Sequence, residues 1–190
     1  MYILEQRILN EGIVASGDVL KVGSFLNQKV DVPFINELAQ EFYSLFKNAG
    51  VNKILTIEAS GISAATLTAH CFGVPMVVAK KSKSQNINGE IYSAKVYSYT
   101  HNTTSDVIVS KDYLNENDHI LIIDDFLAKG AALNGLIDII NQANAILVGC
   151  GILIEKAYQG GGDALRSQGI RVESLAKIKN LYGENGIEFY

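Results

Sequence analysis

Consecutive branched apolar residues at positions 120–123 are typical of a β-strand buried on both faces of a parallel sheet. Two acids, Asp124 and Asp125, follow directly, and a short loop containing Gly130 then leads into an apolar stretch with helical spacing. We therefore predict a strand that ends in acids and turns through glycine into a helix. Such a helix N-terminus can bind a phosphate on its free backbone N–H groups.

The same succession of strand and helix patterns runs through most of the chain. A helix is predicted to start at Asp31, as its cap, with Pro33 in its first turn. Further helices are predicted at 3–11, 62–71, after 131 and at about 163–168, and further strands at 54–57, 75–79, 145–154 and 170–176. Strands that alternate with helices predict an α/β fold, an open parallel sheet with helices on both faces.

Two segments depart from this repeat. Residues 13–30 break into short apolar pieces, which predicts a small irregular subdomain. Residues 80–90 are polar and rich in turn formers, and β-patterned runs follow at 92–99 and 106–110. Together they predict an exposed loop and a hairpin-like insertion. A final turn between short strands is predicted to end the chain.

Composition narrows the class of protein. The chain has 190 residues, 48% hydrophobic and 19% charged, which is typical of one globular domain. A net charge of −4 argues against a nucleic-acid binder. No apolar run reaches the roughly 18 residues of a membrane span, and the N-terminus does not resemble a signal peptide. Cys71 and Cys150 lie among apolar neighbours, so we expect free thiols and a cytoplasmic protein.

Polar residues follow three of the predicted strands, where ligands of open parallel sheets gather. They are the Glu58–Gly61 turn, the acidic pair at 124–125, and Glu155 with Lys156. The acids can accept hydrogen bonds from sugar hydroxyls, and the loops after the strands can bind phosphate, so the combination predicts a sugar-phosphate site. Each strand end also has a plainer interpretation: a capped turn, a solvated helix start, and an exposed ion pair.

Three lysines of the polar loop, Lys80, Lys81 and Lys83, are either a solvated patch or cations that fold over a diphosphate during reaction. The sequence has no G-x-x-x-x-G-K-[ST] loop, which argues against a standard nucleoside triphosphatase. The three histidines show no common spacing with acids or cysteines, so we do not expect them to be catalytic.

The stretch at 120–132 resembles the phosphate-binding loop of type I phosphoribosyltransferases. Residues 20–22, 24–27, 58–62, 124–128 and 154–156 also fit that family, and within it the branch that acts on xanthine. The similarity covers essentially the whole length. It implies a pentosyltransferase of purine salvage, which transfers the 5-phosphoribosyl group from phosphoribosyl diphosphate to xanthine and releases diphosphate. It further implies one phosphoribosyltransferase domain, in which residues 1–32 and about 155–190 form a purine-binding subdomain. The hairpin region at about 80–110 would be a flexible β-hairpin hood over the site.

The resemblance also implies residue roles. As catalytic groups, Asp124 and Asp125 would bind the ribose hydroxyls. The loop that would wrap the 5′-phosphate consists of Ala128, Lys129, Gly130, Ala131 and Ala132. Ser60 and Gly61 would contact the diphosphate. Leu20, Asn27 and Lys156 would bind the purine. No protein metal site is implied, because Mg²⁺ would arrive with phosphoribosyl diphosphate and be held mainly by its oxygens. A homodimer is implied, with no nucleic-acid or membrane partner.

The loop departs from the common family pattern at three positions. Lys129 and Ala132 stand where most relatives place threonine, and Ala128 stands where hypoxanthine-guanine enzymes place an aspartate base. The xanthine branch shares that alanine. Two alternatives stay open: a guanine- or hypoxanthine-preferring relative, and a non-catalytic regulator that senses phosphoribosyl diphosphate. Residues 1–30 are too short and insufficiently basic for the DNA-binding segment that such a regulator usually adds.

Overall fold

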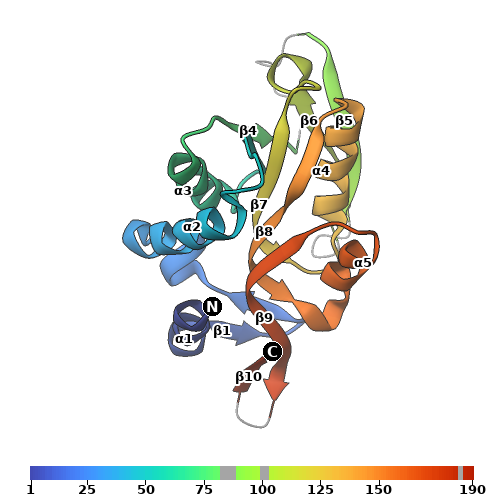
Figure 1. Ribbon diagram of the computed structural model, residues 1–190. Coiled ribbons are helices and arrows are strands. Elements are labelled where there is room, and N and C mark those ends of the chain that lie inside the picture. Colours follow the sequence, from blue (N-terminus) through green and yellow to red (C-terminus); the bar gives the residue numbers. More distant parts are fainter. Residues whose placement is uncertain (82–88, 99–102, 184–185) are drawn as a thin grey trace.

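A six-stranded sheet forms the centre of the computed structural model, which describes residues 1–81, 89–98, 103–183 and 186–190 (Figure 1). The strand order is β10-β9-β8-β7-β3-β4. All neighbouring pairs are parallel except β9 with β10, which is antiparallel. The strands are β3 (Lys53–Ile57), β4 (Met76–Ala79), β7 (His119–Leu127), β8 (Ile146–Lys156), β9 (Val172–Gly183) and β10 (Gly186–Phe189). The predicted parallel-rich α/β sheet is confirmed.

Helices cover both faces of the sheet, as the sequence predicts. Within β7, Leu121 and Ile123 pack with α2 (Val32–Phe46) and α3 (Ile62–Phe72), whereas Ile120 and Ile122 pack with α4 (Ala131–Gln142). All four side chains are fully buried. Because successive side chains on a strand point to opposite faces, one apolar run supplies both cores.

The helix ends follow from local chemistry. The Asp31 carboxylate caps α2 by accepting a hydrogen bond from the Phe34 N–H at 3.3 Å, with Pro33 in the first turn, as predicted. Gly73 ends α3 with φ +67°, a left-handed conformation that favours glycine. The remaining short helices are η2 (Lys111–Tyr113), η3 (Ala157–Gln159) and α5 (Gly161–Ser167).

The predicted hairpin is present as β5 (Ile91–Ser98) and β6 (Thr103–Ser110), a separate antiparallel sheet. It packs on α4, where Gly135 lies so close that an added Cβ would be 2.4 Å from Val96 Cγ2. A bridge between Lys80 and Ile108 joins it to the end of β4. Lys83 and Tyr99 lie outside the described residues, as does most of the predicted loop that precedes the hairpin.

A small N-terminal subdomain lies at one end of the sheet, beside β9 and β10 (Figure 1). It comprises α1 (Tyr2–Glu11), a hairpin of β1 (Ile13–Ala15) and β2 (Val19–Lys21), and a short π-helix, η1 (Gly23–Asn27). The segment predicted to be irregular therefore contains regular, very short elements. The strand predicted at 170–176 continues as β9 to Gly183, and its second half pairs with β10, which forms the edge of the sheet. Among the described residues, no helix is long and apolar enough to cross a membrane.

Candidate active site

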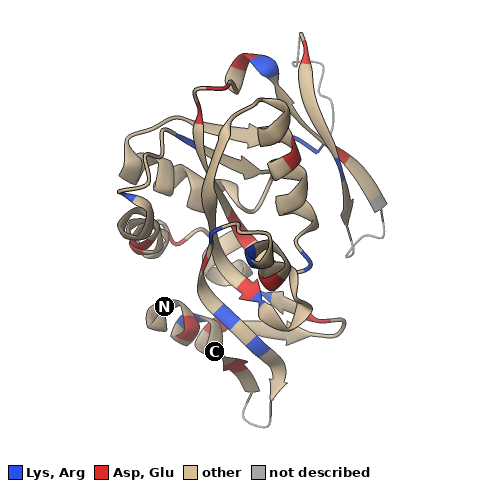
Figure 2. Ribbon diagram, turned by 45° about the vertical axis from the view of Figure 1, so that its right-hand side comes forward, with Lys and Arg blue, Asp and Glu red and all other residues tan. Residues whose placement is uncertain are grey.

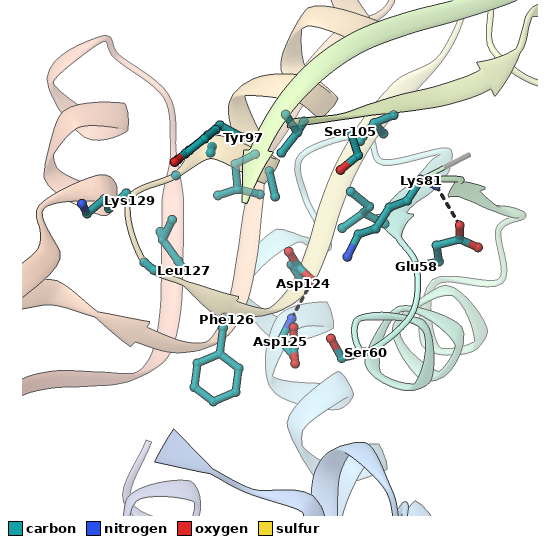
Figure 3. A pocket seen from close by; sticks show the side chains of 18 residues that line it. Glu58, Ser60, Lys81, Tyr97, Ser105, Asp124, Asp125, Phe126, Leu127 and Lys129 are labelled. Atoms are coloured by element: carbon teal, nitrogen blue, oxygen red, sulfur yellow. Dashed lines mark hydrogen bonds between the residues drawn. The ribbon is translucent and has the colours of Figure 1, made fainter. Parts of the chain in front are cut away.

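A cavity of about 280 Å³ opens at the carboxyl ends of β3 and β7, the edge at which the sequence predicts a site (Figure 3). Its walls come from three parts of the chain. Glu58, Ser60 and Lys81 follow strands of the sheet, residues 124–133 contribute the end of β7 and the loop before α4, and the hairpin covers them with Val96, Tyr97, Ser105 and Val107. The fold thus brings together two of the three predicted strand ends.

Asp124 and Asp125 lie within β7, which continues past them to Leu127. The strand was predicted to end before the acids. It continues because β7 still pairs with β8 there, Asp124 opposite Ile152 and Phe126 opposite Ile154. The Asp125 N–H donates to Asp124 Oδ1 at 2.9 Å, and Asp125 Oδ2 accepts from Asn27 Nδ2 at 3.2 Å. The acidic pair is therefore held on a rigid strand and contacts the N-terminal subdomain.

The Asp124 carboxyl has an unfavourable environment for a charge. Burial raises its pKa well above the usual range, and the neighbouring charge of Asp125 raises it further, whereas Lys81 acts in the opposite direction. Gly61 lies directly against it, since an added Cβ would be 2.7 Å from Asp124 Oδ1 and 2.5 Å from Thr56 Oγ1. A glycine at position 61 is therefore required for the turn after β3 to approach the acid.

Lys81 contributes a cation to the cavity wall, next to the carboxylate of Glu58. Glu58 accepts hydrogen bonds from the Lys81 N–H at 2.7 Å and from Lys80 Nζ at 3.1 Å. The Lys81 bond is the main reason that the pKa of Glu58 lies below its usual value, although burial opposes it. The Lys81 side chain points from this turn toward the acidic pair (Figure 3). Of the predicted loop lysines, Lys81 lines the cavity and Lys80 pairs with Glu58.

The loop of residues 128–132 forms the opposite wall and leads into α4 at Ala131. Gly130 has φ +83° and caps the helix, and its carbonyl accepts from the Asn134 N–H at 2.9 Å and from Asn134 Nδ2 at 3.0 Å. The first N–H groups of α4 have no partner within the helix, which makes this wall suitable for an anion. All five residues of the predicted phosphate loop line the cavity.

The three predicted purine residues do not line this cavity. Leu20 is buried and, with Asn27, borders a shallow hollow of about 530 Å³ in the N-terminal subdomain. Lys156 Nζ donates to the Asp18 carbonyl, and the ammonium lies 5.8 Å from the centroid of the Phe126 ring. Burial lowers the pKa of Lys156 below its usual value. Since Phe126 lines the cavity, these residues lie at its margin, on the side of the subdomain.

The plainer interpretation of Glu155, an exposed ion pair with Lys156, is wrong. The Glu155 side chain is 0% exposed and pairs with Arg166 at 2.7 Å. Neighbouring residues on a strand point to opposite faces, so Glu155 and Lys156 cannot face each other on β8. Sequence reasoning also missed Tyr97, which lines the cavity. The predicted hairpin hood was the signal that could have placed Tyr97 there.

Comparisons with known proteins show the family to which this chain belongs. The family described as phosphoribosyl transferase domain matches residues 26–167. The solved adenine phosphoribosyltransferase of Thermoanaerobacter pseudethanolicus shares the fold with a TM-score of 0.75, at 19% identity over 92% of this chain and 99% of that one. The enzyme of Giardia lamblia, complexed with 9-deazaadenine, gives 0.77 at 18% identity, over 92% of this chain and 97% of that chain. The chain belongs to the phosphoribosyltransferase family.

Within that family the chain is similar to bacterial proteins named xanthine phosphoribosyltransferase. The one from Lachnoclostridium phytofermentans is 51% identical over 98% of this chain and 96% of its own length. The one from Finegoldia magna is 50% identical over 97% of each chain, and that from Bacillus cereus is 48% identical over 98% of this chain and 93% of its own. The family resemblance predicted from the residues is confirmed.

Proposed function

We propose that this protein transfers the phosphoribosyl group of phosphoribosyl diphosphate to xanthine, forming xanthosine 5′-monophosphate and diphosphate. One observation carries the proposal: a buried acidic pair, a glycine-containing loop at a helix N-terminus and a lysine surround one cavity, in a chain half identical to proteins named for this reaction. In this assignment Asp124 and Asp125 accept hydrogen bonds from the ribose hydroxyls, and residues 128–132 bind the 5′-phosphate.

The chemistry requires orientation and charge stabilisation. Displacement of diphosphate at the anomeric carbon creates an oxocarbenium-like centre and releases a polyanion. In this proposal Ser60, Gly61 and the Lys81 ammonium bind the diphosphate, opposite the phosphate loop, and the sugar spans the cavity between two anion sites. The positions of Ser60 and Lys81 on the cavity wall support this assignment. Rigid strand ends then hold the anomeric carbon in line with the incoming purine nitrogen.

Leu20, Asn27 and Lys156 are the proposed purine residues. Asn27 bonds Asp125 of the acidic pair, Leu20 borders the same hollow as Asn27, and Lys156 lies near the ring of Phe126. Their bonds in the structure, Asn27 to Asp125 and Lys156 to the Asp18 carbonyl, would have to be exchanged for contacts with the purine. With Ala128 in place of an aspartate, no carboxylate on the loop can remove a proton from the purine. Xanthine suits this site because it is the more acidic purine.

A magnesium ion fits this site as a companion of phosphoribosyl diphosphate. Among the described residues, no three His, Cys, Asp or Glu side chains lie together as a metal cluster. The cavity wall instead offers oxygen donors, the carboxylates of Asp124 and Asp125 and the hydroxyl of Ser60, which suit a hard cation that keeps most ligands from its substrate. The ion would neutralise part of the diphosphate charge.

We also propose that the protein is a cytoplasmic homodimer.

Charge distribution gives no support to the alternative of a DNA-binding regulator. Lysines and arginines are interspersed with acids over the described chain (Figure 2), and the net charge is −4. The second alternative, a preference for guanine or hypoxanthine, differs only in the purine that is accepted. A direct assay separates the three candidate functions: transfer to xanthine, transfer to guanine or hypoxanthine, and regulation without catalysis.

The assay measures diphosphate release from magnesium and phosphoribosyl diphosphate with xanthine, guanine or hypoxanthine. We expect the highest kcat/KM with xanthine. Lys156→Ala should raise the KM for xanthine about tenfold or more, as expected for loss of a charge-assisted hydrogen bond, and change the KM for phosphoribosyl diphosphate much less. Release with guanine or hypoxanthine at higher kcat/KM would reassign the purine. If no diphosphate is released with any of the three purines, the proposal that this protein is a phosphoribosyltransferase enzyme is refuted.

A further inference from the structure

A buried carboxylate lies behind the phosphate loop and has no part in the proposed chemistry. Glu155, near the end of β8, is fully buried. Arg166 Nη1 donates to Glu155 Oε1 at 2.9 Å and Arg166 Nη2 donates to Oε2 at 2.7 Å, while Ser174 Oγ donates to Oε2. Two parallel bonds from a guanidinium fix both the direction and the plane of the carboxylate.

This pair ties α5 to the sheet. Arg166 belongs to α5, and its Nε also donates to the Val172 carbonyl at the start of β9, at 3.2 Å. Burial alone would raise the pKa of Glu155, but the bonds from Arg166 and Ser174 outweigh it and keep the pKa below its usual value. The carboxylate therefore stays ionised at neutral pH, and the pair holds α5 in one position.

Two consecutive glycines connect the pair to the phosphate loop. Gly162 lies against the carboxylate, where an added Cβ would be 2.1 Å from Glu155 Oε1. Gly161 lies against the loop, where an added Cβ would be 2.3 Å from the Ala128 carbonyl oxygen and 2.7 Å from the Gly130 nitrogen. The Gly161 N–H donates to that Ala128 carbonyl at 3.1 Å. The backbone of residues 161–162 is thus packed between the ion pair and the loop.

We propose that Glu155 and Arg166 are positioning residues for the phosphate loop and act through the Gly161–Ala128 hydrogen bond. This inference rests on the proposed function. The loop has alanine, lysine, glycine and alanine side chains at 128–132 and no hydroxyl. Apart from the Lys129 ammonium, the loop can bind the 5′-phosphate only with its backbone N–H groups, whose directions are set by the path of the loop. A bond from outside the loop fixes that path, and small displacements of a binding group have large effects on rate and affinity.

The test is the affinity for ribose 5-phosphate, measured by calorimetry, together with the KM of each substrate. Glu155→Gln keeps the shape of the side chain but loses its charge. We expect it to raise the Kd for ribose 5-phosphate and the KM for phosphoribosyl diphosphate about tenfold, with the KM for xanthine changed less than threefold. Arg166→Lys keeps the positive charge, so its Kd for ribose 5-phosphate should rise less than that of Arg166→Met.

Asp118→Asn is the matched control. Asp118 is a buried carboxylate that accepts from Lys53 Nζ at 2.8 Å and from the Asn115 N–H at 2.8 Å, at the opposite end of the sheet. Its substitution should lower the Tm and leave the Kd for ribose 5-phosphate unchanged. If Glu155→Gln behaves in the same way, the pair is only structural and the proposal is refuted.

Two further outcomes are decisive. If Glu155→Gln does not fold, Ser174→Ala and Arg166→Lys answer the same question with smaller expected losses of about two- to fivefold in affinity, and wild-type affinity in both would refute the proposal. A wild-type protein that does not bind ribose 5-phosphate would refute the proposed function instead. Binding without turnover would refute the proposed reaction and still allow this test, because the calorimetric measurement needs no purine.

Discussion

Asp124 is a residue whose proposed role in function opposes its contribution to stability. Its carboxyl is buried beside Asp125 and the turn at Gly61, and its pKa is raised mainly by burial. The unfolded chain ionises this group near its ordinary pKa of 3.8, so folding at higher pH places a poorly solvated charge in the sheet. This cost in folding free energy is absent at pH values below the ordinary pKa and is complete above the pKa of the folded protein.

We therefore predict that Asp124→Asn raises the Tm while it removes activity. The gain should grow as the pH rises from about 4 to 8, by roughly 2–4 °C for each kcal/mol of folding free energy recovered. The kcat/KM for phosphoribosyl diphosphate should fall by about a hundredfold or more. Thermal unfolding at several pH values tests this, with the exposed Asp138→Asn as control. A Tm at or below wild type at pH 8 would contradict the argument.

Individual site residues differ in how far the sequence specifies them. Gly130 and the acidic pair could be predicted because a strand, an acid and a helix start are adjacent in the chain, and the structure places them on one cavity. The partner of Glu155 could not, because Arg166 follows eleven residues later in a different element and only the packing of α5 brings the two together. Contacts made across elements leave no spacing signal in one sequence.

At the scale of elements, long buried strands were predicted best and short or chain-terminal ones least. The apolar run of β7 gave both the strand and the two faces of the sheet. Its end was predicted too early because acids usually mark solvent, whereas here pairing with β8 continues through them. The strands β1 and β2 have three residues each, too few to show the alternation that identifies a strand.

The packing of α4 against the hairpin gives a test at this scale. Gly135→Ala should destabilise the protein, since the new Cβ meets Val96 Cγ2 and overpacking typically costs about 1–3 kcal/mol, more than the roughly 1 kcal/mol gained in helix propensity. Because Val96 lines the cavity, the KM for phosphoribosyl diphosphate should rise as well. A double-mutant cycle with Val96→Ala measures the coupling: the second substitution should restore most of the stability. Additive losses would show that the two side chains do not limit the approach of the elements.

At the scale of the whole molecule, the N-terminal subdomain shares one core with the sheet. Leu4 and Ile8 of α1 and Phe25 of η1 belong to the same buried cluster as Leu121 of β7. Arg7 reinforces this connection, pairing with Asp31 at 2.9 Å and lying 5.3 Å from the centroid of the Phe25 ring. The subdomain has no separate core, which supports the proposal of a single domain.

One cooperative domain predicts one unfolding transition. Ile8→Ala removes a fully buried side chain of α1 and should lower the free energy of unfolding of the entire protein by about 2–5 kcal/mol. Leu9→Ala, at the next position and 44% exposed, should change it by less than about 0.5 kcal/mol. Unfolding in urea is followed by far-UV circular dichroism and by residual activity. In Ile8→Ala the midpoints of both transitions should shift to lower urea concentration by the same amount. If activity is lost at a lower urea concentration than the helical signal, α1 and its neighbours unfold separately from the sheet, and the proposed purine residues Leu20 and Asn27 belong to a second cooperative unit.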